Sequence, residues 1–135
     1  MAQQDIAAVI PFARELGLEV DEATPGQVRG HMTWRPELCT SFDVMHGGAL
    51  MAFADTLGAL CASLNLPEGA MTTTIESKTN FFRAIREGEV HATTRPLHVG
   101  RTTIVVQTDL RDDRGKLVAQ TTQTQAVLRP EPRQT

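Results

Sequence analysis

The chain has 135 residues and a formal net charge of −3 at pH 7. This length fits a single domain over residues 1–135 with a core of its own and leaves no room for a second one. The charges are scattered along the chain, so they form neither the basic surface of a nucleic-acid-binding protein nor a membrane-binding patch.

The amino terminus, Met1 to Asp5, lacks the basic stretch of a secretory signal peptide. The two cysteines, Cys39 and Cys61, have neither metal-site nor redox spacing, so we expect reduced thiols. These features predict a cytoplasmic protein with no bound metal and no cofactor.

The N-terminal segment 1–15 is predicted to be helical, because its apolar residues have the spacing of a short amphipathic helix over 4–15. Pro11 weakens that prediction. A proline inside a helix removes a hydrogen bond and clashes with the preceding turn.

Two strands are predicted next, over 16–23 and 27–34. The turn between them, 23–26, contains a Pro-Gly pair, which is a strong turn signal. We expect 35–46 to be a loop.

The chain beyond residue 70 has the alternation of a β-sheet. Strands are predicted over 71–82, 89–99, 102–111 and 116–128. Pro96 indicates a bulge or a sheet edge, since proline cannot donate to a ladder. Residues 112–115 should form a hairpin turn in which Gly115 can take a positive φ, and 129–135 should be a frayed tail. Two strands, one long helix and four strands make an α+β fold with an antiparallel sheet.

The long helix is predicted over 47–64, where apolar residues recur at helical spacing. The residues of this apolar stripe are Leu50, Phe53, Ala54, Leu57, Leu60, Cys61 and Leu64. The opposite face is uncharged except for one residue, and it holds Gly48, Ala52, Asp55, Ala59 and Ala62. We therefore expect both faces to be covered, one by the sheet and one by a second copy of the chain. A membrane span is disfavoured, because Asp55 and Thr56 lie in the middle of the segment.

Asp55 is the only ionisable side chain of this helix apart from Cys61. Burying a carboxylate costs free energy unless the charge is stabilised or used. Two interpretations stay open from the residues alone: an aspartate held by hydrogen bonds at a subunit interface, or a functional acid.

His46, Gly47 and Gly48 stand directly before and at the start of the helix. Two glycines there weaken a helix, because glycine loses the most entropy on ordering. They are useful where a ligand must approach the backbone, since first-turn N–H groups suit an oxygen that gains negative charge. The alternative is a loop-to-helix junction that requires unusual dihedral angles.

Residues 46–58, HGGALMAFADTLG, resemble the signature of the PaaI-like branch of the hotdog-fold acyl-CoA thioesterases. The resemblance continues through 80–88 (NFFRAIREG), 96–101 (PLHVGR) and the last hairpin. It implies a hotdog fold, in which a curved antiparallel β-sheet wraps a long central helix. It also implies dimers joined edge to edge, usually paired again as tetramers, with each active site between two subunits.

The resemblance further implies roles for three residues. In such enzymes the backbone N–H of the glycine matching Gly47 binds the thioester oxygen, and the histidine matching His46 helps to frame the site. The acid matching Asp55 comes from the partner subunit and acts as base for water or as nucleophile. One departure concerns the preceding loop, where some relatives carry Gln or Asn at or near Thr40; here Thr40 or Ser41 would have to replace that longer side chain.

The predicted activity is hydrolysis of an aromatic or medium-chain acyl-CoA. Such a reaction needs an oxyanion donor, a carboxylate and a pocket that excludes bulk water. The candidate catalytic residues are Asp55, Gly47, His46 and Thr56; the candidate substrate-binding residues are Thr40, Gly48, Asn80, Phe81, Gly100, Arg101 and Thr102. Thr56 either holds water or the carboxylate, or bonds back to its own helical turn. Phe42, Phe81 and Phe82 either line the acyl pocket or belong to the core.

The nucleotide end of the substrate has its candidate site at 98–102, with the turn at 83–88 as a second one. The planar guanidinium of Arg101 suits phosphates, and Gly100 lets a ligand approach the backbone. The alternative is an ordinary turn with a solvated arginine.

Two other functions remain possible on the same fold. A non-catalytic acyl-CoA sensor would keep the glycines but would not need the acid. A hotdog hydratase or dehydratase places an Asp/His pair differently, and no second matching motif is present.

Overall fold

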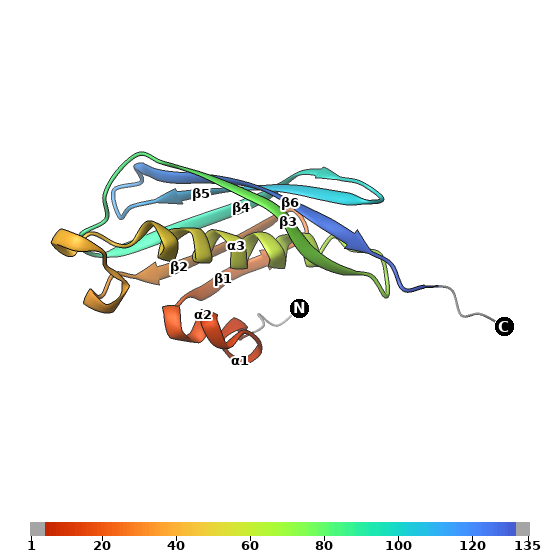
Figure 1. Cartoon of the computed structure of the whole chain (residues 1–135), viewed down its shortest axis with the longest axis horizontal. Coiled ribbons are helices and arrows are strands. Elements are labelled where there is room, and N and C mark those ends of the chain that lie inside the picture. Colours follow the sequence, from red (N-terminus) through yellow and green to blue (C-terminus); the bar gives the residue numbers. More distant parts are fainter. Residues whose placement is uncertain (1–4, 132–135) are drawn as a thin grey trace.

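A computed structural model describes residues 5–131 of the chain. Six antiparallel strands form one sheet in the order β1-β2-β4-β5-β6-β3, and the long helix α3 (Gly47–Ser63) runs along one face of it (Figure 1). The strands are β1 (Glu19–Thr24), β2 (Gln27–Thr33), β3 (Met71–Phe81), β4 (Glu89–Val99), β5 (Thr103–Arg111) and β6 (Leu117–Leu128). The predicted α+β order of two strands, one long helix and four strands is confirmed.

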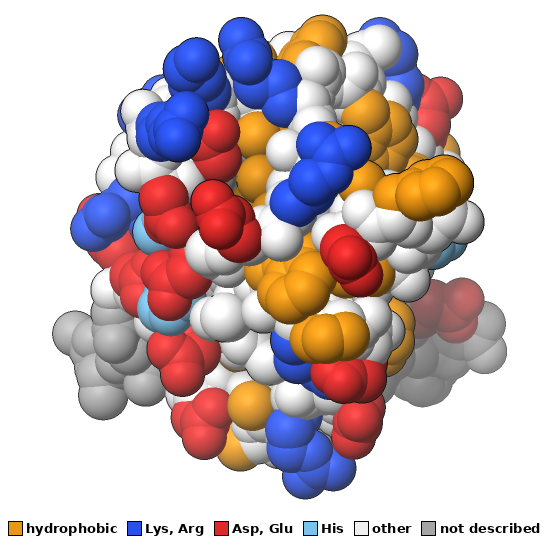
Figure 2. Space-filling model, turned by 90° about the vertical axis from the view of Figure 1, so that its left-hand side faces the viewer, with side chains coloured by type: hydrophobic (Ala, Val, Ile, Leu, Met, Phe, Trp, Pro, Cys, Tyr) orange, Lys and Arg blue, Asp and Glu red, His pale blue; other side chains and the backbone are white. Residues whose placement is uncertain are grey.

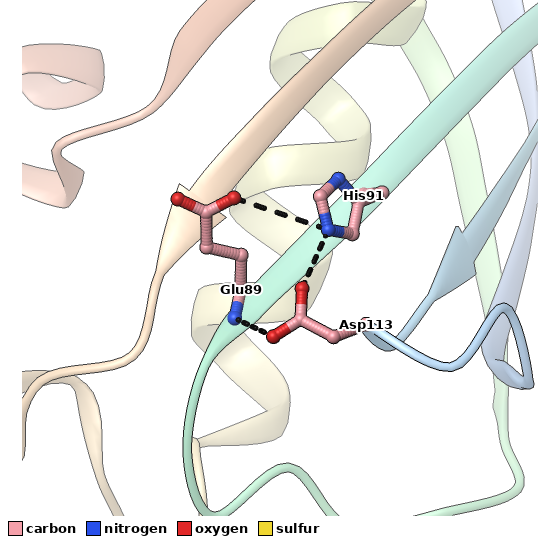
Figure 3. A group of neighbouring side chains, drawn as sticks. All are labelled: Glu89, His91 and Asp113. Carbon is pink, nitrogen blue, oxygen red and sulfur yellow. Dashed lines mark hydrogen bonds and ion pairs between the residues drawn. The ribbon is translucent and has the colours of Figure 1, made fainter.

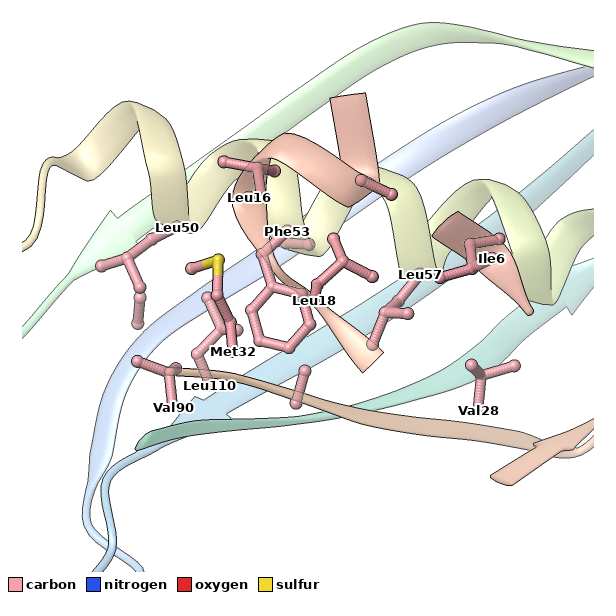
Figure 4. Close-up of a cluster of buried hydrophobic side chains, with 14 of the residues drawn as sticks. Ile6, Leu16, Leu18, Val28, Met32, Leu50, Phe53, Leu57, Val90 and Leu110 are labelled. Atoms are coloured by element: carbon pink, nitrogen blue, oxygen red, sulfur yellow. The ribbon is translucent and has the colours of Figure 1, made fainter. Parts of the chain in front are cut away.

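The core lies between α3 and the concave face of the sheet, because α3 contacts all six strands. The helix buries most of the apolar residues that its periodicity predicted, among them Leu50, Phe53 and Leu57, whereas Leu60 and Leu64 are partly buried. Figure 4 shows Phe53 pointing from α3 toward Met32 and Leu110 of the strands. Burial of a side chain of this size stabilises the fold by about 1.5–3 kcal/mol. The predicted hotdog arrangement, a curved sheet around a central helix, is thus confirmed.

The N-terminal segment differs from the single helix that we predicted over 4–15. It forms two short helices, α1 (Ile6–Val9) and α2 (Pro11–Leu16), separated at Ile10, whose backbone is extended. Pro11 is the physical reason, since it starts α2 well but cannot continue α1. Gly17 ends α2 with a φ of +72°, so the first strand begins at Glu19 rather than at residue 16. Residues 1–4 lie outside the described part of the chain.

The loop before α3 contains two 3₁₀ turns, η1 (Pro36–Leu38) and η2 (Ser41–Asp43), and an isolated bridge between Cys39 and Met45. Phe42 and Asp43 both have positive φ values, 62° and 60°. The Trp34 Nε1 group donates to the Asp43 carbonyl oxygen at 3.0 Å and ties this part of the loop to the end of β2.

The bulge predicted at Pro96 is confirmed, since the β4–β5 register shifts between Pro96 and His98. Strand β4 lies inside the sheet, between β2 and β5. Its pairing with β2 ends at Thr94, so the β2–β4 ladder requires no backbone N–H from Pro96. The turn after β5 has Gly115 at φ +79°, as predicted. Residues 129–131 have no regular secondary structure, and the rest of the predicted tail lies outside the described residues.

The face of α3 opposite its apolar stripe, which we expected a second copy of the chain to cover, is already buried in part by the chain itself. Ala62 is buried by the chain itself, whereas Gly48, Met51 and Asp55 are exposed. Beside this face runs β3, an edge strand whose only neighbour within residues 5–131 is β6. No helix within residues 5–131 is long and apolar enough to cross a membrane.

Candidate active site

The start of α3 presents a backbone donor without an acceptor. His46 is the N-cap residue, and its Nδ1 accepts a hydrogen bond from the Gly48 N–H at 2.7 Å. The His46 carbonyl oxygen accepts from the Ala49 N–H. No atom of residues 5–131 accepts from the Gly47 N–H. This N–H lies at the positive end of the helix dipole and can bind an oxygen that gains negative charge.

Both glycines at this helix start are explained by close approaches. A Cβ on Gly48 would lie 2.8 Å from His46 Nδ1 and would displace the capping ring. A Cβ on Gly47 would lie 3.2 Å from Cζ of Phe81, whose ring covers the start of α3 from the end of β3. The alternative that we left open, unusual dihedral angles, does not apply, because neither glycine has a positive φ.

Asp55 lies in the middle of α3 and is held by side chains of two strands. Its Oδ1 accepts from Gln123 Nε2 at 2.5 Å and from Thr74 Oγ1 at 3.1 Å. Gln125 Nε2 donates to Thr74 Oγ1 at 2.7 Å. Asp55 Oδ2 has no partner among residues 5–131. One carboxylate oxygen is therefore held, and the other is available to a ligand.

Thr74, Gln123 and Gln125 were not among the predicted site residues. A signal for the two glutamines exists on β6, because its inward positions at Thr121, Gln123 and Gln125 are polar although all three side chains are buried. A buried strand face normally carries apolar residues. A run of polar residues on such a face indicates a hydrogen-bond network, although it does not reveal the partner.

A hollow of about 200 Å³ opens beside Asp55. Its lining residues are Met51, Ala52, Asp55, Thr74 and Ser77. Ser77 Oγ is buried and has no hydrogen-bond partner. The hollow thus combines a carboxylate, two hydroxyl groups and a short apolar wall.

The family model described as thioesterase superfamily matches residues 42–119, more than half of the chain. The chain belongs to the thioesterase superfamily. A candidate esterase of Vibrio cholerae is 38% identical over 104 residues, which are 77% of this chain and 66% of that protein. The 1,4-dihydroxy-2-naphthoyl-CoA hydrolase of Escherichia coli is 31% identical over 87 residues, 64% of either chain. A thioesterase structure from Haemophilus influenzae matches with a TM-score of 0.83 and 30% identity, covering 87% of this chain and 82% of that one.

This membership places the chain among hotdog-fold enzymes that hydrolyse thioesters. It confirms the family that the motif at 46–58 resembles. The matched region runs from the loop before α3 into β6 and contains His46, Gly47, Asp55 and Thr74.

Thr56 has the more ordinary of its two predicted roles. Its hydroxyl donates to the Ala52 carbonyl oxygen at 2.8 Å, four residues earlier in α3. It therefore bonds back to its own turn and does not contact the Asp55 carboxylate.

The candidate substrate-binding residues fall into two groups at opposite ends of the molecule. Thr40, Asn80 and Phe81 lie toward the end at which α3 begins, and Thr40 donates its backbone N–H to Val44 O at 2.8 Å. Gly100, Arg101 and Thr102 form the turn between β4 and β5, which Figure 1 shows at the other end. Within one chain, the two groups cannot bind the same small part of a substrate.

The three phenylalanines near the helix start are not core residues. Of the two alternatives predicted for them, membership of the core is therefore wrong. Phe42, Phe81 and Phe82 are 90%, 49% and 55% exposed. Figure 2 looks onto this end of the molecule and shows hydrophobic side chains gathered among charged ones. Exposed aromatic rings beside the free Gly47 N–H fit an apolar ligand or a second protein surface.

A separate polar cluster lies on the outer face of the sheet, away from α3. His91 Nε2 lies 2.8 Å from Asp113 Oδ1 and 3.9 Å from Glu89 Oε2, and Figure 3 shows the three side chains converging. Asp113 also accepts from the Glu89 N–H at 3.1 Å. The hydrogen bond with His91 lowers the pKa of Asp113 from its ordinary value. Because these groups satisfy one another, the cluster is explained without a metal ion.

Proposed function

We propose that this protein hydrolyses an acyl-CoA with an aromatic or medium-chain acyl group. The observation that carries the proposal is Asp55: it is the one charged side chain of α3, with Oδ1 held, Oδ2 free and a hollow beside it. The unpaired Gly47 N–H at the start of the same helix is the natural oxyanion donor. The name of the E. coli relative, a naphthoyl-CoA hydrolase, supports an aromatic acyl-CoA.

The proposed reaction needs only these groups and water. In the base mechanism, Asp55 Oδ2 takes a proton from water as the water oxygen bonds to the thioester carbon. The carbonyl oxygen becomes an oxyanion and accepts from the Gly47 N–H. When the carbonyl re-forms, the C–S bond breaks, and the thiolate leaves and takes up the proton. In the nucleophile mechanism, Oδ2 itself attacks the carbonyl carbon, the C–S bond breaks and the thiolate leaves. Water then hydrolyses the resulting mixed anhydride to the free acid and the Asp55 carboxylate, and the thiolate takes up the proton that this water releases.

The geometry of α3 supports an active site between two subunits. An α-helix rises about 1.5 Å per residue, so Gly47 and Asp55 lie about 12 Å apart along the axis. Both groups must reach atoms of a single carbonyl at about 3 Å. One chain cannot do this. Two copies with antiparallel α3 helices place Gly47 of one subunit near Asp55 of the partner subunit.

The dimer surface that we propose is the exposed side of α3 together with the edge strand β3. This strand exposes apolar side chains, with Met71 70% and Ile75 61% accessible. The outer edge of β3 has no partner strand among residues 5–131, and an open edge of this length invites pairing with a second copy. A dimer, or a tetramer built from dimers, would cover both surfaces.

We expect a dimer or tetramer mass in light scattering at micromolar concentration. The variant Met51→Lys, which places a charge on the exposed side of α3, should shift the mass toward the monomer. The matched control is Val9→Lys, also an exposed apolar residue but on α1, and it should keep the wild-type mass. A monomeric wild-type protein would contradict the proposed site.

Arg101 is proposed to bind the nucleotide phosphates. No described residue accepts from its guanidinium, and the Arg129 side chain donates to its carbonyl oxygen at 3.2 Å, so two cations meet at this turn. We expect Arg101→Ala to weaken CoA thioesters about ten- to a hundredfold and short pantetheine thioesters little, because a charge-assisted bond is lost only in the first case. KM values for both substrates measure this, with Arg95→Ala as control. Equal effects on both would remove Arg101 from the nucleotide site.

Thiol release from a panel of thioesters tests the activity itself. Aromatic, medium-chain and short acyl-CoA substrates should be compared with acyl groups on a carrier protein. A sensor or a hydratase would release no coenzyme A, so an inactive panel with tight acyl-CoA binding would favour the non-catalytic alternative.

The cytoplasmic location of the protein also remains a prediction.

A further inference from the structure

Gln123 carries a buried amide with one end satisfied and the other end not. Its side chain, 1% exposed, extends from β6 to α3. Nε2 donates to Asp55 Oδ1 at 2.5 Å, whereas Oε1 is buried without a partner. The reverse orientation of the amide would place Oε1 against the carboxylate, and two negative oxygens repel. The orphaned oxygen is thus a consequence of the contact with Asp55.

Gly58 provides the space for this amide. A Cβ on Gly58 would lie 1.9 Å from Gln123 Oε1 and 2.7 Å from Gln123 Cδ, so no other residue fits while Gln123 holds its position. Gly58 is also in the interior of α3, where glycine is unfavourable. Two costly features, a mid-helix glycine and an unpaired buried carbonyl, therefore accompany the contact of Gln123 Nε2 with Asp55, which comprises the short bond to Oδ1 and a longer one of 3.4 Å to the backbone carbonyl oxygen.

The second donor to Asp55 is oriented by its own neighbours. Gln125 Nε2 donates to Thr74 Oγ1 at 2.7 Å, and the Thr72 hydroxyl lies 3.1 Å from Gln125 Oε1 and 2.8 Å from the Ala126 carbonyl oxygen. Because Thr74 Oγ1 accepts from Gln125, its own proton is directed to Asp55 Oδ1. Both donors thus reach the same oxygen, and Oδ2 is left without a donor among residues 5–131.

We propose that Gln123 is a positioning residue, which fixes the Asp55 carboxylate through Oδ1 so that Oδ2 is the reacting oxygen. Gly58 serves this arrangement by making room for the amide. The inference rests on the proposed role of Asp55 and adds which oxygen takes the proton from water or attacks the carbonyl. Two hydrogen bonds to one oxygen restrain the rotation of the carboxylate, so the free oxygen keeps a narrower range of directions.

The test is Gln123→Met, which keeps the length of the side chain and removes the donor. We expect kcat to fall about ten- to a hundredfold, the effect of losing a hydrogen bond to a charged group, while KM changes little. The thermal midpoint should stay or rise, because the unpaired buried oxygen is removed. A structural role predicts the opposite pattern. A lowered midpoint with unchanged kcat would overturn the inference.

Thr121→Val is the matched control. Thr121 is buried on the same face of β6, but its hydroxyl pairs with Thr79 at 2.7 Å and does not contact Asp55. This variant should keep the wild-type kcat. An equal loss in both variants would show that any change on this face of β6 lowers turnover, and would count against Gln123.

A double-mutant cycle separates this inference from the proposed function. In the Asp55→Asn background, Gln123→Met should cause no further loss of kcat. A fully active Asp55→Asn protein would refute the proposed function. An inactive Asp55→Asn protein together with a fully active Gln123→Met protein would refute only the role of Gln123.

Gly58 can be tested even if its single variant folds poorly. Gly58→Ala should lower the thermal midpoint, and Gln123→Ala combined with Gly58→Ala should restore much of it, since the shortened side chain leaves room for the methyl group. A Gly58→Ala protein as stable and as active as wild type would overturn the claim that Gly58 makes room for the amide.

Discussion

Replacement of Asp55 by asparagine should reduce kcat by about 10²–10⁴, the usual contribution of a positioned base, and leave the fold intact. Asparagine keeps an acceptor for Gln123 Nε2 and Thr74 Oγ1, which both donate to Oδ1 of the native residue. It loses the negative charge and the basic oxygen. Thermal midpoints close to wild type, measured beside thiol release, would show that the loss is chemical.

Asp109→Asn is a suitable control for this experiment. Asp109 also accepts from a glutamine amide, Gln120 Nε2 at 2.8 Å, but on the outer face of the sheet. The control should retain wild-type turnover. If Asp55→Asn stays within about threefold of wild type, far below the expected contribution of a base, Asp55 is not the catalytic carboxylate.

The second large effect is expected for Gly47→Pro, which deletes the unpaired N–H. Proline is well tolerated at the first position of a helix, and Gly47 occupies this position in α3. His46 before it is extended, with ψ 134°, as a residue preceding proline requires. We expect kcat to fall about 10²–10³, the usual cost of one oxyanion donor.

The variant Gly47→Ala separates the effect of losing the N–H donor from the effect of adding side-chain atoms at this position. Alanine keeps the N–H and introduces a Cβ, which proline also carries, 3.2 Å from the Phe81 ring. That ring is half exposed and can move. Gly47→Ala should therefore be faster than Gly47→Pro, and Phe81→Leu should relieve its remaining defect. Equal kcat values for folded Pro and Ala variants would refute an oxyanion role of the Gly47 N–H.

Two predictions from the sequence were wrong. In one, a proline overrode the helical spacing, and in the other, packing within the chain buried a residue that was expected at the helix surface. Pro11 divided the predicted N-terminal helix, because a missing N–H outweighs amphipathic spacing. Ala62 was assigned to the second face of α3 by angle alone, yet it is fully buried within the chain. For Thr56 the structure instead shows one of the two predicted roles, the hydrogen bond to its own turn.

The sequence by itself determined the features that depend on neighbours along the chain. The period of apolar residues defined α3 and the strands, since burial of one face imposes that period. The absence of other charges singled out Asp55, and the resemblance at 46–58 indicated the family.

Only the tertiary structure decided how the candidate site is assembled. Gln123 lies 68 residues from Asp55 in sequence, and Thr74 lies 19 residues from it. The sheet order β5-β6-β3 brings both side chains to the same carboxylate. It also explains why Gly58 is a glycine, because a Cβ there would clash with Gln123, whereas a Cβ at Gly47 would make a tight contact of 3.2 Å with the Phe81 ring. No local pattern encodes such contacts, since they arise when distant strands close over one helix.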